Sequence, residues 1–106
     1  MDKLWEERVD NSFGSNLPER PTSYLKDRVI GCIFDDETGL ANRDRIGMEL
    51  ITFETDYPHA DSTFPDTEKI ATQICVDAGL SESEVYALMR GNAIRAFGLE
   101  RFGVEA

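Results

Sequence analysis

A short apolar segment, residues 50–53, is followed by an acid, an aromatic residue, a proline and a histidine: Asp56, Tyr57, Pro58 and His59. A carboxylate placed at the end of a strand can take a proton from an attacking water or from a substrate. His59 is the only histidine in the 106 residues, so few side chains are present to complete a site around Asp56. The pattern predicts Asp56 as the catalytic residue.

The neighbours of Asp56 allow a functional and a structural interpretation. His59 can contact substrate or support the Asp56 carboxylate as a hydrogen-bond donor. A histidine beside a proline in a loop is, however, as often a cap or a surface group. Tyr57 can lie over a substrate pocket or pack against neighbouring loops. Asp36 and Asp61 are further loop acids, which we interpret as solvated turn residues rather than substrate ligands.

The composition limits the classes of partner. The chain has 106 residues, enough for one small domain over residues 1–106, and is 41% hydrophobic and 30% charged with a net charge of −10. Nucleic acid and anionic membranes would be repelled, and no apolar run approaches the ~20 residues of a membrane helix. The first residues lack a secretory pattern, so we expect a cytoplasmic protein. Cys32 and Cys75 are predicted to be buried thiols.

Two apolar runs predict the strands. Residues 29–34 and 50–53 are continuously apolar or nearly so, without alternation, as in parallel strands buried on both faces. Residues 35–49 between them suffice for a crossover with a short helix, whereas a hairpin would need far fewer residues. The order indicates an α/β fold.

Helices are predicted before and after these strands. Residues 1–9 predict a short helix with Leu4, Trp5 and Val9 along one side. Thr63 or Asp66 can cap a helix that runs to Ala78, with Pro65 near its first turn and Gly79 after its end; its predicted apolar face comprises Ile70, Ala71, Ile74, Cys75 and Ala78.

The last third of the chain predicts two more helices. Ser81 and Glu84 are spaced as a capping box, and the helix they begin is expected to end at Gly91. Asn92 is placed to cap a final short helix that stops at Gly98.

Three segments in order resemble amidohydrolase-related metal-dependent hydrolases, of the aminocarboxymuconate-semialdehyde decarboxylase type. They are residues 55–65 (TDYPHADSTFP), residues 91–99 (GNAIRAFGL) and residues 21–25 (PTSYL), in the last of which Thr22 and Leu25 depart from the family pattern. The resemblance covers nearly all of the chain from Pro21 onward.

The resemblance implies a (β/α)8 TIM-type barrel of ~250 residues, with chemistry at the carboxyl ends of its strands. Residues 29–34 and 50–53 would be strands seven and eight, so the chain would be the C-terminal part of the barrel. Asp56 would be the strand-eight acid, which ligates a divalent metal, most commonly zinc, or accepts a proton. The family's other ligands are histidines on strands one, five and six, and the sequence contains none of them. Asn92 and Arg95 would hold the last helix on the barrel.

Three functional hypotheses follow. In the first, the chain is the C-terminal segment of a metal-dependent enzyme that hydrolyses a C–N or C–O bond or decarboxylates a small carboxylic acid, and it is inactive alone. In the second, it is a non-catalytic remnant that uses exposed strand edges to form a homo-oligomer or to pair with a missing barrel portion. In the third, Asp56 and His59 act as an acid–base pair without a metal.

Overall fold

Two short parallel strands form the centre of the fold. The structure, a computed structural model, describes residues 1–7 and 16–105. Strand β1 spans Gly31–Ile33 and β2 spans Ile51–Phe53, with Gly31 opposite Ile51. The predicted parallel pair is confirmed, although both strands are shorter than the apolar runs. Val29 closes a turn by donating its N–H to the Leu25 carbonyl at 3.1 Å, and residue 50 belongs to the turn before β2.

The crossover contains two short helices and a turn. They are α2 (Glu37–Ala41), α3 (Arg43–Ile46) and the 3-10 turn η2 (Met48–Leu50). Asp36 begins α2 because its carboxylate accepts hydrogen bonds from the N–H groups of Thr38 and Gly39, at 2.9 and 3.1 Å. Asp36 is therefore a helix cap, in agreement with its interpretation as a turn residue.

The core lies on one face of the two strands. Its buried cluster comprises Ile33, Leu40, Ile51, Cys75 and Leu88. Cys75 is buried as predicted, whereas the prediction for Cys32 is wrong, since Cys32 is exposed. Successive strand residues face opposite sides, so Cys32 points away from the face that carries Ile33 and the helices.

Helix α4 spans Thr67–Asp77 and returns along the core face. Asp66 occupies its N-cap position without a side-chain hydrogen bond, and Pro65 precedes the helix. Thr63 does not cap it, because the Thr63 hydroxyl donates instead to the Thr55 carbonyl, 8 residues back along the loop. Gly79 follows the helix with φ +60, a left-handed conformation that suits glycine.

The remaining helices form one continuous rod instead of two. Helix α5 (Glu82–Tyr86) passes through a π-turn, η3 (Ala87–Gly91), into α6 (Asn92–Phe97), and a 3-10 turn, η4 (Leu99–Phe102), follows. The predicted end at Gly91 is wrong, because Gly91 is itself helical. The Tyr86 ring lies close to Gly91, and a Cβ added there would meet the ring at 2.7 Å. Gly98 ends α6 with φ +59, as predicted.

Asn92 and Arg95 attach this rod to the sheet. The prediction that Asn92 caps a helix is wrong: it lies within the rod with φ −65, and its amide donates to the carbonyls of Met48 and Ile51, both at 2.8 Å. Arg95 donates to the Glu49 carbonyl. The prediction that this pair holds the last helix in place is confirmed.

The capping box at the start of α5 also joins it to the crossover. Glu84 accepts from the Ser81 N–H at 2.8 Å and from Nε of Arg43 at 2.9 Å. These contacts, the Ser81 backbone bond first, lower the pKa of Glu84 to about 2. Glu84 is therefore ionised across the neutral and mildly acidic range.

We expect Glu84 to make the fold acid-sensitive. A carboxyl group whose pKa is lower when folded stabilises the fold above its unfolded pKa of ~4.3, and that stabilisation is lost as the pH falls towards about 2. Urea midpoints measured across this window should fall less steeply for Glu84→Gln than for the wild type. Glu82→Gln, a charge removal in the same helical turn, is the control and should keep the wild-type slope.

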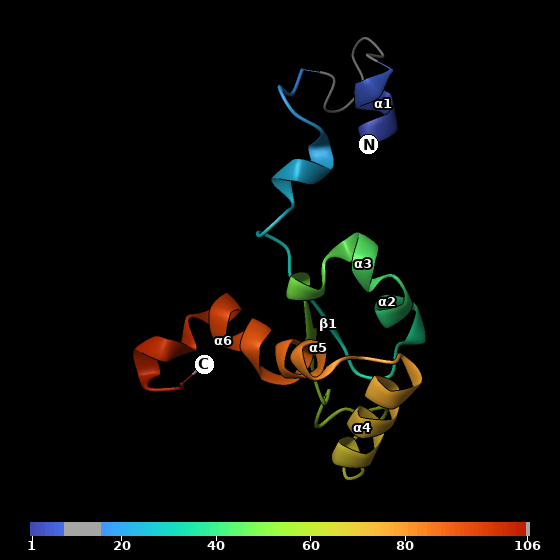
Figure 1. Cartoon of the computed structure of the whole chain (residues 1–106), viewed down its shortest axis with the longest axis vertical. Helices are drawn as coiled ribbons and strands as arrows, with labels where there is room; N and C mark the ends of the chain where they lie inside the picture. The colour runs from blue at the N-terminus through green and yellow to red at the C-terminus, as the bar shows by residue number, and fades with distance from the viewer. Residues whose placement is uncertain (8–15, 106) are drawn as a thin grey trace.

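The N-terminal segment lies away from the rest of the fold (Figure 1). Helix α1 (Asp2–Glu6) contacts the 3-10 turn η1 (Pro21–Tyr24), and Nε1 of Trp5 donates to the Leu17 carbonyl at 2.7 Å. The predicted first helix is confirmed over five residues, and Val9 lies outside the described residues. In the part of the chain that the structure describes, no helix has the length and apolarity needed to cross a membrane. The cytoplasmic location stays a prediction.

Candidate functional site

The loop that follows β2 is closed on itself by threonines. Thr63 donates its N–H to the Thr55 carbonyl at 3.0 Å and its hydroxyl to the same oxygen at 3.2 Å. The Thr63 hydroxyl also lies 3.0 Å from that of Thr67, the first residue of α4. Thr63 is buried, so the base of the loop is fixed between the end of β2 and the start of α4.

Asp56 lies in this loop just beyond the carboxyl end of β2. Its φ of +57 is in the left-handed region, which aspartate tolerates better than most residues. Its carbonyl accepts the N–H of His59 at 2.9 Å, so residues 56–59 form a tight turn. The turn places the Asp56 carboxylate beside His59, and the Asp56 side chain is 25% exposed.

The turn brings the two predicted site residues together. Nδ1 of His59 lies 3.0 Å from Oδ1 of Asp56, while the His59 side chain is 71% exposed. With the proton on Nδ1, the imidazole donates to the carboxylate and fixes its orientation. The pair can hold and pass a proton, and the second carboxylate oxygen, Oδ2, remains available to a substrate, a water or a cation.

Tyr57 packs against the loop itself. Its ring meets that of Phe64 edge to face, with centroids 5.0 Å apart and planes at 64°. Tyr57 is 64% exposed, so one side of this aromatic pair faces solvent next to the Asp56 turn. Asp61 is an exposed residue of the same loop. The substrate-binding roles of Tyr57 and His59 remain predictions.

Glu54 is a neighbour of the site that the sequence analysis missed. It forms a hydrogen bond with the Cys32 thiol, and this bond, with burial as the second cause, raises the pKa of the thiol. The charge of Asp56 makes a smaller contribution in the same direction. Part of the signal was present in the sequence, because Glu54 lies two residues after Thr52, the register partner of Cys32, and residues two apart on an extended segment share a face.

The described residues do not form a metal site on their own. Within the ranges 1–7 and 16–105, no group of three or more histidine, cysteine, aspartate or glutamate side chains is placed to hold a metal ion. Asp56 and His59 supply two donors, and catalytic zinc sites usually take three protein ligands with an open position.

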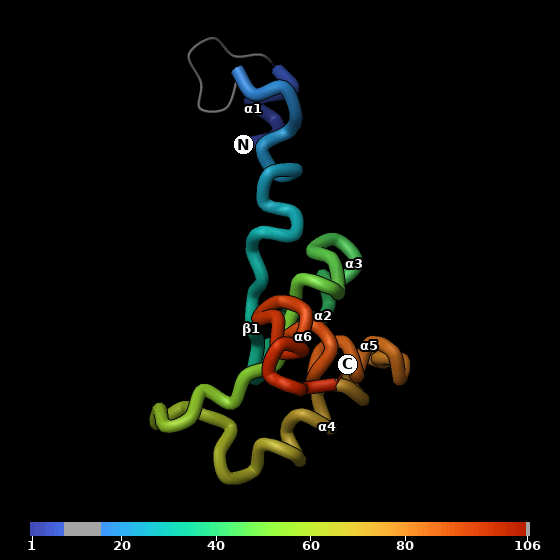
Figure 2. Tube along the Cα trace, turned by 90° about the vertical axis from the view of Figure 1, so that its left-hand side faces the viewer, coloured from blue at the N-terminus to red at the C-terminus, as the bar shows by residue number. Residues whose placement is uncertain are grey.

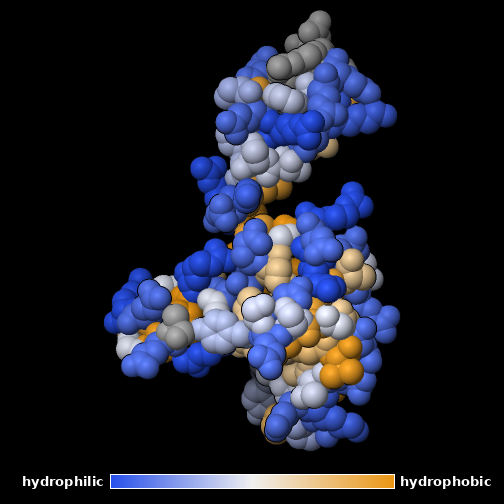
Figure 3. Space-filling view, viewed as in Figure 1, coloured by the Kyte–Doolittle hydropathy of each residue, from blue (hydrophilic) through white to orange (hydrophobic). Residues whose placement is uncertain are grey.

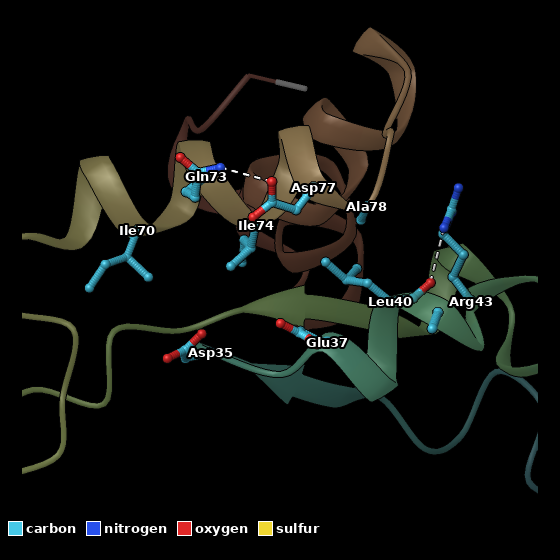
Figure 4. A pocket seen from close by; sticks show the side chains of 10 residues that line it. Asp35, Glu37, Leu40, Arg43, Ile70, Gln73, Ile74, Asp77 and Ala78 are labelled. Carbon is cyan, nitrogen blue, oxygen red and sulfur yellow. Dashed lines mark hydrogen bonds between the residues drawn. The ribbon is translucent and has the colours of Figure 1, made fainter.

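A cavity of about 640 Å³ lies elsewhere, between the crossover and α4. Ile70 and Ile74 point from α4 toward the crossover, where Asp35 and Glu37 line the opposite side (Figure 4). Hydrophobic surface gathers between α2 and α4 (Figure 3). Neither Asp56 nor His59 lines this cavity, so it is separate from the candidate site.

Comparison with known proteins places the chain in a family. A family sequence model described as amidohydrolase matches residues 13–99, which include both strands, the Asp56 turn and the helical rod. The chain belongs to the amidohydrolase family. Among the curated proteins, none matches the sequence.

Membership of the amidohydrolase family agrees with the geometry. The family folds as TIM barrels, and two parallel strands joined by a helical crossover are consistent with part of such a barrel. Amidohydrolases generally bind divalent metals, which indicates an origin among metal-dependent hydrolases. The finer resemblance to the aminocarboxymuconate-semialdehyde decarboxylase type stays a prediction.

Proposed function

We propose that the chain is the C-terminal segment of an amidohydrolase-family barrel and supplies Asp56 as the strand-eight acid of its metal site. The observation that carries this proposal is the position of Asp56 at the carboxyl end of β2, with its carboxylate oriented by His59 at 3.0 Å. In TIM barrels, side chains at this end of the strands perform the chemistry. The family match makes hydrolysis or decarboxylation the reaction to test.

Asp56 acts in this proposal as ligand and proton acceptor. Its partly shielded carboxylate has one oxygen occupied by His59 and the other available, which suits the transfer of one proton between substrate and protein. His59 acts through Asp56 by fixing its orientation. Tyr57, beside the same turn, offers an exposed aromatic face to a small substrate.

The segment is inactive alone in this proposal, because its described residues include no metal-holding group of three. The substrate is a small molecule with a scissile C–N or C–O bond, or a small carboxylic acid that loses CO₂. Zinc is the metal we propose for the assembled barrel, with its histidine ligands supplied by the missing barrel portion.

Complementation tests this proposal. The 106-residue chain is mixed with a barrel portion of another amidohydrolase that ends after its sixth strand. We expect the two parts to elute together, to retain zinc and to hydrolyse or decarboxylate that enzyme's substrate, while the chain alone retains no stoichiometric zinc. Separate elution, or a mixture no more active than its parts, would contradict the proposal, as would a stoichiometric zinc in the chain alone.

A second candidate function, an oligomerising module, is favoured by one observation. Gly31 and Cys32 of β1 are exposed and Val29 before the strand is 55% exposed, so the first two residues of β1 are uncovered. Uncovered strands pair readily with other strands.

A further inference from the structure

The backbone of Cys32 faces the free edge of β1. The Ile33 carbonyl accepts the N–H of Glu54 at 2.9 Å, so the main-chain groups of Ile33 turn toward β2. Main-chain groups of successive strand residues point to opposite sides. Gly31 therefore also faces β2, and the N–H and carbonyl of Cys32 point outward, to the side on which the described residues supply no strand.

No strand of the described residues pairs with this edge. Gly31 and Cys32 are exposed, although Cys32 sits at the centre of the strand. In Figure 2, the trace of β1 lies at the left-hand margin of the view. Its edge thus presents unpaired donors and acceptors to another chain.

The two flanks of β1 differ in charge, so they can attract the opposite flanks of a second copy that runs antiparallel. Lys26, Asp27 and Arg28 precede the strand with a net charge of +1 (two cations and one acid), and Asp35, Asp36 and Glu37 follow it with a charge of −3. In an antiparallel copy centred on Cys32, Arg28 of each chain lies opposite Asp36 of the other, whereas Asp27 lies opposite Glu37, so the net attraction comes from the opposite signs of the two flanks. A parallel copy would place like charges together, so the charge order favours the antiparallel arrangement.

We propose that β1 pairs with β1 of a second copy of this chain, antiparallel across a two-fold axis at Cys32, to form a continuous four-stranded sheet. The outward-facing groups of Cys32 make it a hydrogen-bonded pair with Cys32 of the other copy. Ile30 of one copy then lies opposite Phe34 of the other, and both are half-buried in the single chain. The pairing gives the second candidate function a specific interface, and it concerns the chain alone, because in the proposed barrel the same edge of β1 would pair with strand six.

The register predicts which cysteines approach each other. The Cα atoms of a hydrogen-bonded antiparallel pair lie ~5.5 Å apart, within the ~4.4–6.8 Å range of disulfides. Diamide, which takes two electrons and two protons from a pair of thiols, should therefore link Cys32 to Cys32 in the dimer. Cys75 is buried and serves as the internal control.

Light scattering over a wide concentration range tests the interface itself. Because the shared edge is short, we expect a concentration-dependent rise toward twice the chain mass of 11.9 kDa. Cys32→Ser should dimerise like the wild type and lose the diamide-linked product. Cys32→Lys places like charges at the two-fold axis on an exposed position and should remain a monomer.

A proline at position 32 tests the pairing of the β1 edge without removing the hydrogen bonds between β1 and β2. Cys32→Pro removes the N–H that points to the free edge and leaves the groups that face β2, so it should be monomeric while its circular dichroism matches the wild type. Cys32→Lys keeps the test decisive if the proline variant fails to fold. A monomer at every wild-type concentration would overturn the proposal, and so would a dimer that persists in Cys32→Lys or in a folded Cys32→Pro.

A variant at Asp56 distinguishes this proposal from the enzymatic one. Asp56→Asn should dimerise as the wild type does, because it changes no group on the β1 edge. A dimer that requires the Asp56 carboxylate would contradict the antiparallel register centred on Cys32.

Discussion

Asp56→Asn should lower the activity of the complemented barrel by ~10²–10⁴-fold, the range usually supplied by a general acid–base residue. Asparagine keeps the shape of the side chain and tolerates the left-handed backbone that residue 56 adopts, so the loop should persist. It carries no charge to ligate a cation strongly and no oxygen that accepts a proton near neutral pH. Steady-state kinetics of the mixture of the two barrel portions measures the effect.

Asp61→Asn is the matched control for this prediction. It removes the same charge from an exposed position five residues further along the same loop and should leave the rate near that of the wild type. If the two variants lose activity equally, the effect comes from the charge of the loop and not from Asp56. An active Asp56→Asn mixture would remove the residue from the catalytic role.

His59→Gln separates orientation from chemistry at the same site. If His59 only fixes the carboxylate of Asp56, the variant should lose less activity than Asp56→Asn, because a glutamine amide can still donate a hydrogen bond. A loss as large as that of Asp56→Asn would assign the proton transfer to His59 instead.

The sequence predicted the parallel strands because their signal is local. An apolar run followed by a crossover-length segment is sufficient to identify such a pair, and the Ser81–Glu84 capping box is equally local. The ends of β1 and β2 were not predictable in the same way. They depend on the turn at Leu25 and on η2. Both turns form through backbone hydrogen bonds, which the residue types do not predict.

The errors at Cys32 and Asn92 share one cause. Each residue was assigned from its immediate neighbours, whereas its state depends on an element distant in the sequence. Cys32 is exposed because it lies on an edge strand that has no described strand on its other side. Asn92 binds carbonyls 41 and 44 residues away, which outweighs its usual preference for a cap position.

The candidate site was predicted in part. The spacing of Asp56 and His59 suggested a pair, but their contact depends on the left-handed turn at Asp56 and on the closure of the loop by Thr55 and Thr63. Threonines are common in loops, so nothing in their identity marks this closure. The contact of Glu54 with Cys32 follows from strand alternation once the register of the two strands is given.

Asn92→Ala should destabilise the fold by about 2–3 kcal/mol, because it leaves two carbonyl oxygens, those of Met48 and Ile51, without their donor in a buried environment. Asn92 is only 5% exposed, so water cannot readily replace the lost bonds. Native domains are stable by ~5–15 kcal/mol in total, which makes this a large share. Urea unfolding followed by circular dichroism measures the change in free energy.

Two further variants identify the cause of that loss. Asn92→Asp has nearly the same size, but an ionised carboxylate cannot donate to the two carbonyls and repels them, so it should cost at least as much as Asn92→Ala. Asn42→Ala removes an amide whose hydrogen bond to the Thr38 carbonyl is exposed, and it should change the free energy by no more than ~0.5 kcal/mol. If Asn92→Asp were as stable as the wild type, packing rather than hydrogen bonding would join the helical rod to the sheet. The expected order therefore makes hydrogen bonding by the Asn92 amide, beside that of Arg95, the attachment that holds α6 on the sheet and with it the position of β2 and Asp56.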